Sequence, residues 1–169
     1  MKAPADREQA LSLFREGPVL LEQAIADLPE TYLDAVPAKG GWTIRQIVHH
    51  IVDGDDIWKI GIKMALGNEN AELSLTWYSA FPQETWGKRW AYSERSIDVS
   101  LAFLEATRNH VLQLLESVPD AWTQSVAVRS KTDTELEKVP IGFIIQMQAN
   151  HVVHHIKRIR EIIRELENA

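Results

Sequence analysis

Helical periodicity dominates the pattern of apolar positions along the chain. Four stretches repeat apolar residues every three or four positions, which is the spacing that lines one face of a helix. They cover about residues 4–28, 43–66, 93–118 and 140–167. Four long helices in 169 residues predict an all-α fold, a four-helix bundle that forms a single domain over residues 1–169.

Local signals mark where these helices begin and end. Thr43, followed three residues later by Gln46, forms a capping box that starts the second helix, and Gly67 supplies its stop. Pro140 suits the first position of the last helix. Inside the first helix, Pro18 predicts a kink or a break, because proline has no N–H to donate.

Two predicted connections, residues 67–92 and 119–139, are long, since helices in bundles are usually joined by about 2–8 residues. The first of them is rich in aromatic side chains: Trp77, Tyr78, Phe81, Trp86, Trp90 and Tyr92. Packing over exposed core is the simplest role for such a crossover. Lining the mouth of a pocket and forming a dimer interface stay open.

Composition excludes several classes of function. The formal net charge is -6 and no basic, aromatic stripe is present, which argues against binding of nucleic acid or of anionic membranes. The chain has no cysteine, so it has no disulfide, thiolate metal site or cysteine nucleophile. It shows no signal segment and no apolar stretch long enough to cross a bilayer, which predicts a cytoplasmic protein.

The candidate chemistry lies in the histidines. In GGWTIRQIVHHIVD (residues 40–53), adjacent side chains point about 100° apart on a helix, so the two histidines face different ways. His50 falls in the apolar sector, whereas His49 falls on the charged side together with Arg45. We therefore expect His50 to face the core and His49 to face solvent.

The last helix carries QMQANHVVHHIKRI (residues 146–159). His155 falls within its apolar face and His151 at the edge of that face, one turn earlier, while His154 points to solvent. Histidines four residues apart on one helix can chelate a single ion. With His50 added, three neutral imidazoles are expected to meet inside the bundle.

Alternative roles for these side chains stay open. A single buried histidine is more often a hydrogen-bonded structural residue than a ligand, and we interpret His110 in that way. The inward sorting of three histidines favours a metal ion. Gln148 is a candidate for orienting a ligand, or else a satisfied core amide. Asp53, a nearby carboxylate, is expected to project outward from its helix.

A site of three histidines without a carboxylate leaves a doubly positive ion with an open position, which is typical of catalytic zinc. Such an ion activates water or a thiol for attack on a small electrophile. The thiol would have to be a cofactor, because the chain has no cysteine. The alternative is a non-catalytic metal-binding or interaction protein, in which the ion only pins the second and fourth predicted helices.

The sequence resembles the DinB/YfiT-like superfamily of metal-dependent helical bundles. The likeness covers nearly the whole chain and rests on Trp42 before the helix cap, on the histidine that precedes Ile-x-Asp, and on HVVHH in the last helix. It implies an antiparallel four-helix bundle with a divalent ion, often zinc or nickel, held by His50, His151 and His155. It also implies a homodimer that acts on a small-molecule substrate.

The resemblance also suggests the chemistry. Some members are thiol S-transferases that use bacillithiol or mycothiol, one group isomerises maleylpyruvate, and many are named only as hydrolases. The resemblance therefore implies a metal-dependent thiol S-transferase or a hydrolase of small electrophiles. The sequence departs from the YfiT-like pattern at Arg158, where histidine or glutamine is usual, and at Gly54-Asp55, where Ser-His is usual. These changes spare the ligands and alter their surroundings.

Overall fold

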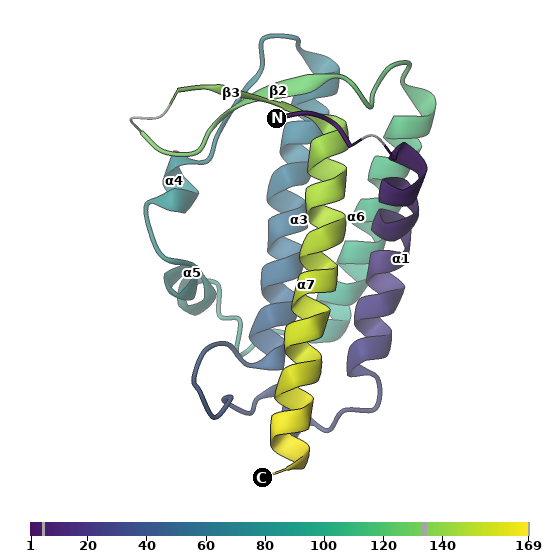
Figure 1. Cartoon of the computed structure of the whole chain (residues 1–169). Helices are drawn as coiled ribbons and strands as arrows, with labels where there is room; N and C mark the ends of the chain where they lie inside the picture. Colours follow the sequence, from purple (N-terminus) through teal and green to yellow (C-terminus); the bar gives the residue numbers. More distant parts are fainter. Residues whose placement is uncertain (5, 133–134, 169) are drawn as a thin grey trace.

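Four long helices lie side by side and form the body of the molecule (Figure 1). The computed structural model describes residues 1–4, 6–132 and 135–168. The long helices in these ranges are α1 (Arg7–Ile25), α3 (Ile44–Gly67), α6 (Ile97–Ser117) and α7 (Ile141–Glu167). Helices α1 and α3 each pack against both α6 and α7. The predicted four-helix bundle is confirmed.

The core follows the apolar faces that the sequence pattern predicts. Large aliphatic side chains from all four helices are almost completely buried, among them Leu21, Ile47, Ile51, Leu104, Val111, Ile145, Val152 and Ile159. Complete burial of one such side chain contributes about 1.5–3 kcal/mol. None of the described helices is both long and apolar enough to cross a membrane.

The helix ends agree with the capping signals better than with the apolar pattern. The Thr43 hydroxyl accepts from the Gln46 N–H, and the Gln46 side chain accepts from the Thr43 N–H, which confirms the capping box. The first helix ends at Ile25 instead of residue 28, and a short helix α2 (Glu30–Leu33) follows it. The third long helix begins at Ile97 instead of residue 93.

Helix α1 runs through Pro18 as one element, so of the predicted kink or break the break does not occur. Proline leaves the carbonyl four residues earlier without an intrahelical donor. That carbonyl, on Phe14, accepts a hydrogen bond of 2.9 Å from Nη1 of Arg108 on α6. Gly17 leaves room for the guanidinium, because a Cβ there would lie 2.2 Å from Nη1. Arg108 thus replaces the missing donor.

Arg108 connects all four long helices. It is 1% exposed, and it donates to both carboxylate oxygens of Asp55 on α3, with distances of 2.6 and 3.1 Å. Its Nη2 also donates to the carbonyl of Gln148 on α7, at 3.0 Å. The sequence analysis missed this pair, because two charged residues 53 positions apart carry no local signal. Each charge is buried with a partner, as burial requires.

A small sheet covers the end of the bundle where α3 ends and α7 begins (Figure 1). Its strands, β1 (Glu72–Ser74), β2 (Ser125–Arg129) and β3 (Glu137–Pro140), lie in that order. The first pair is parallel and the second antiparallel. Val126 and Val128 point into the core, while their neighbours along β2 are less buried. The sequence pattern predicted only two long connections here and no strands.

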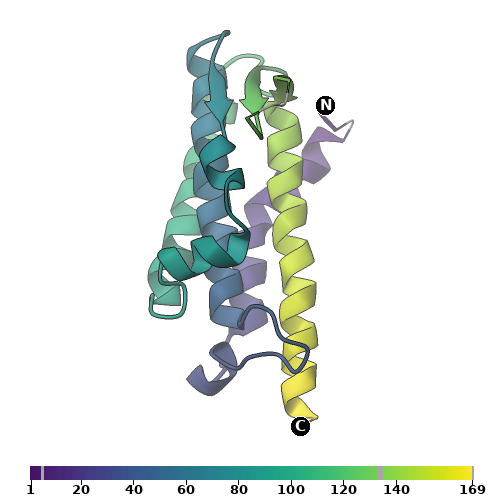
Figure 2. The same cartoon turned by 90° about the vertical axis from the view of Figure 1, so that its left-hand side faces the viewer.

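The aromatic crossover forms two further short helices, α4 (Thr76–Ser79) and α5 (Gln83–Arg89), which run alongside α3 (Figure 2). Its aromatic rings pack mainly on one another: Tyr78 stacks on Trp86 and Trp90. The indole N–H of Trp86 donates to the Tyr78 carbonyl at 2.8 Å. These contacts form an aromatic cluster within the crossover, in which Trp77 and Phe81 remain exposed, and they do not choose between the roles left open by the sequence.

Replacing Arg108 tests the importance of this connection. In Arg108→Met, Asp55 loses its buried partner, and we expect the free energy of unfolding to fall by about 3–5 kcal/mol. Arg15→Met is the matched control, because Arg15 is exposed and its contact with Glu116 is 3.7 Å long. That loss should be about 0–1 kcal/mol. Urea titrations measure both losses, and equally small losses would contradict the assignment.

Candidate metal centre

His50 of α3 and His151 and His155 of α7 come together between the two helices, and we call them the histidine cluster. Nε2 of His151 lies 3.1 Å from Nε2 of His50 and 3.1 Å from Nε2 of His155. One ring nitrogen from each residue lies within 4.8 Å of the other two. The structure thus brings together the three side chains that helical periodicity selected.

Burial keeps the cluster neutral. Burial, with smaller contributions from the neighbouring His151 and His155, lowers the pKa of His50 to about 3. Burial likewise lowers the pKa values of His151 and His155 to about 4, with smaller contributions from adjacent histidines. The imidazoles are therefore uncharged at neutral pH, which is the protonation state that binds metal ions.

Hydrogen bonding alone does not satisfy this arrangement. A neutral imidazole nitrogen carries either one hydrogen or one lone pair, so it makes one strong hydrogen bond. Nε2 of His151 faces two other Nε2 atoms at the same distance. Within the described ranges, Nδ1 of His151 and Nδ1 of His155 are buried without a hydrogen-bond partner. Three neutral ring nitrogens within 4.8 Å of one another suit a shared cation.

Trp42 holds one side of the cluster. Its ring meets the His50 ring edge to face at 4.7 Å between centroids and contacts the buried Tyr92 on its other side. Asp53 is half-buried and pairs with Arg95 at 2.9 Å, so it does not join the cluster. Gln148 is buried one turn before His151, and its side-chain oxygen has no partner among the described residues.

The other histidines do not join the cluster, although the His154 ring contacts the His155 ring at 5.1 Å between centroids. His154 is exposed, as predicted. His110 is also exposed, on α6, so its interpretation as a buried structural histidine is wrong. The prediction that His49 faces solvent is wrong. His49 is fully buried, with Nδ1 2.8 Å from the Ser100 hydroxyl and Nε2 3.1 Å from the Arg95 carbonyl. Burial lowers its pKa, and its hydrogen bonds give it a structural role.

Arg45 belongs to the same correction, because it was also placed on the solvent side. It is 8% exposed and pairs with Asp34 at 2.6 Å and with Glu30. That face of α3 is covered by α2 and by the segment that leads into α6, which reaches Arg45 through the Arg95 carbonyl. Polar residues on it therefore have protein partners instead of water.

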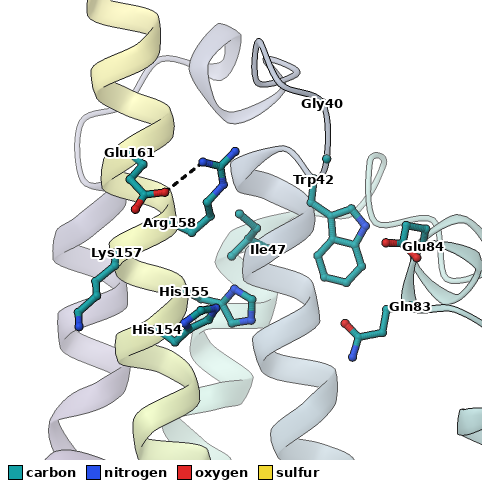
Figure 3. A pocket seen from close by; sticks show the side chains of 11 residues that line it. Gly40, Trp42, Ile47, Gln83, Glu84, His154, His155, Lys157, Arg158 and Glu161 are labelled. Atoms are coloured by element: carbon teal, nitrogen blue, oxygen red, sulfur yellow. Dashed lines mark hydrogen bonds and ion pairs between the residues drawn. The ribbon is translucent and has the colours of Figure 1, made fainter.

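A cavity of about 420 Å³ opens beside the cluster (Figure 3). It lies between α7, the loop before α3 and the start of α5, and His155 forms part of its wall. Trp42 and Ile47 supply an apolar side, and Gln83 and Glu84 lie beside Trp42, across from the residues of α7. The sequence analysis left a pocket role for the crossover open, and α5 takes part in that role. A small molecule fits this space.

Comparisons with known proteins agree with the fold and the resemblance. A family profile described as the DinB superfamily matches residues 13–159. A Bacillus cereus protein, provisionally named a metal-dependent hydrolase, is 31% identical over 146 residues, which cover 86% of this chain and 79% of that protein. An Oceanobacillus iheyensis protein with the same provisional name is 27% identical over 147 residues, 87% of this chain and 80% of that protein.

Two solved structures share the fold. YfiT from Bacillus subtilis, described as a probable metal-dependent hydrolase with an unusual four-helix bundle topology, matches with a TM-score of 0.81 at 23% identity. The match covers 99% of this chain and 94% of YfiT. A mycothiol-dependent maleylpyruvate isomerase matches with a TM-score of 0.65 at 16% identity, over 89% of this chain and 59% of the isomerase. At these identities the likeness establishes the fold alone.

The lowered pKa values predict how stability depends on pH in metal-free protein. The unfolded chain takes up protons on its histidines near pH 6.5, whereas the folded cluster takes them up only near pH 3 to 4. Stability should therefore fall as the pH drops from about 6.5 towards 4. His50→Gln should flatten this slope in urea titrations, whereas His110→Gln, at an exposed position of α6, should not. An unchanged slope in His50→Gln would overturn the assignment.

Proposed function

Because the chain belongs to the DinB superfamily, we propose that it is a divalent-metal-dependent enzyme with His50, His151 and His155 as the metal ligands. The observation that carries the proposal is the convergence of their ring nitrogens within 4.8 Å of one another. The names of the Bacillus cereus relative and of YfiT, both of which refer to metal-dependent hydrolysis, support it.

The donor set fits a divalent transition metal. In a tetrahedral site with Zn–N bonds of about 2.0–2.1 Å, ligand nitrogens lie about 3.3 Å apart. The two Nε2 separations that involve His151 are both 3.1 Å and are close to that value, and all three donor atoms lie within 4.8 Å of one another. Imidazole accepts zinc and nickel alike, so we propose one of these two ions without choosing between them.

The reaction class follows from the charge and number of the ligands. Three neutral ligands leave the charge of the ion uncompensated and leave a position for a reactant. An ion bound there supplies Lewis-acid activation of a nucleophile, either water for hydrolysis or a thiol for group transfer. The thiol would be a low-molecular-weight co-substrate of the bacillithiol type, since the chain has no cysteine. We propose thiol S-transfer or hydrolysis of a small electrophile.

The protein's own residues prepare the site. The helical spacing of His151 and His155 holds two donors rigidly on α7, and Trp42 restrains the His50 ring and shields it from water. His155 lines the adjoining cavity, so a small molecule in the cavity can approach the cluster from that side. The small-molecule partner is part of the proposal. The homodimer, the cytoplasmic location and the lack of nucleic-acid binding stay predictions.

Elemental analysis tests the ligand set. Protein purified without a histidine tag or chelator should contain about one transition-metal ion per chain, as a single tetrahedral site requires. His151→Ala should lose it, because two imidazoles bind far more weakly than three. His154→Ala is the matched control: it removes an exposed histidine from the same helix and should retain the ion. Full metal content in both variants, or none in the wild type, would refute the site.

Whether added ligands can reach the ion distinguishes an enzyme from a protein in which the metal only holds α3 and α7 together. The visible spectrum of a cobalt-substituted sample should shift when azide or a small thiol is added, because the open position and the cavity admit these ligands. Cobalt in a closed tetrahedral site keeps its spectrum. An inert spectrum would establish the structural alternative and end the enzymatic proposal.

A further inference from the structure

Arg158 is placed to recognise part of the ligand in the cavity beside the histidine cluster. It lies three residues after His155 on α7, which is nearly one turn, and both side chains line the cavity. Figure 3 shows the Arg158 side chain reaching from α7 towards the side of Ile47 and the loop at Gly40. Its guanidinium is about one-third exposed, so a ligand has access to it.

Acidic neighbours hold the guanidinium through one nitrogen. Nη1 of Arg158 lies 3.1 Å from Glu161 and 3.6 Å from Glu165. Nε and Nη2 make no hydrogen bond to any residue in the described part of the chain. Arginine binds a carboxylate through two parallel N–H groups, and this pair of nitrogens presents such a fork. The ion pairs orient the side chain and leave its recognition edge available.

The charge of the cavity favours an anion once the proposed ion is bound. The cations Lys157 and Arg158 on its wall are equal in number to the acids Glu84 and Glu161. The histidines are neutral, so the two charges of a divalent ion make the cavity positive. Figure 3 shows Lys157 directed away from Trp42 and Ile47, which leaves Arg158 as the cation that faces the apolar wall.

We propose that Arg158 binds a carboxylate of the substrate or thiol co-substrate while the reactive end of the same molecule meets the histidine cluster. The inference rests on the proposed function and specifies its substrate class as small organic acids. Glu161, which holds the guanidinium, lies six residues beyond His155, or about 9 Å along the helix axis. An extended ligand with a short aliphatic linker spans that distance when its contacts with the ion and with the guanidinium are included. Trp42 and Ile47 supply an apolar surface for that linker.

A pair of matched thiols tests this role. The cobalt-loaded full-length protein is titrated with 3-mercaptopropionate and with its uncharged amide, and binding is followed by the sulfur-to-cobalt absorption. We expect the acid to bind at least about tenfold more tightly than the amide, because a charge-assisted, two-point contact is lost with the amide. Arg158→Gln should reduce this preference to about twofold or less, and Arg158→Lys should restore part of it.

Arg160→Gln is the control, because it removes the same charge from an exposed position two residues along α7 and outside the cavity lining. It should keep the wild-type preference. A preference that survives in Arg158→Gln, or equal binding of acid and amide to the wild type, would overturn the inference. So would cobalt uptake without binding of either thiol, with the metal site left intact. Failure to take up cobalt would instead refute the proposed function, and this inference with it.

Discussion

The guanidinium of Arg108 joins the four long helices at one buried point. It extends from α6 to the carboxylate of Asp55 on α3 and to the carbonyls of Phe14 on α1 and Gln148 on α7. The Phe14 carbonyl is available only because Pro18 has no N–H to donate to it. Burial of two charges is costly, and a core with apolar residues in place of a buried ion pair is often equally stable or more stable. We infer that this ion pair mainly fixes how the helices are aligned along their axes.

That alignment determines where the histidines meet. Helices α3 and α7 run in opposite directions (Figure 1). His50 precedes Asp55 by five residues and His151 follows Gln148 by three, so both histidines lie on the same side of Arg108 along the bundle. Their offsets are about 7.5 and 4.5 Å along the helix axes. A shift of α7 by one turn against α3 would move His151 away from His50 and would also break the contact with Arg108.

The long helices and the histidine cluster were predictable because one periodicity determines both. His50 and His155 share faces with aliphatic residues, and whatever lies on such a face meets the core. The wrong predictions concern polar residues, whose burial depends on distant parts of the chain and not on helical periodicity. His49 and Arg45 are polar and were placed in water, but Ser100, Arg95 and Asp34 from distant parts of the chain cover them. The strands are only three to five residues long, which is too short for a clear pattern, and β1 pairs with β2 across more than fifty positions, so no local signal marks that partner.

Burial also distinguishes the cluster histidines from the residues of the cavity wall. The cluster histidines occupy inward or edge positions of α3 and α7, where core packing fixes the backbone around them. Arg158, Gln83 and Glu84 project from partly or fully exposed positions of α7 and the crossover, where substitution disturbs little packing. The donors are therefore constrained by the stability of the bundle, while the cavity wall is free to change. Under the proposed function, a change of substrate would require a new cavity wall but no new set of metal ligands.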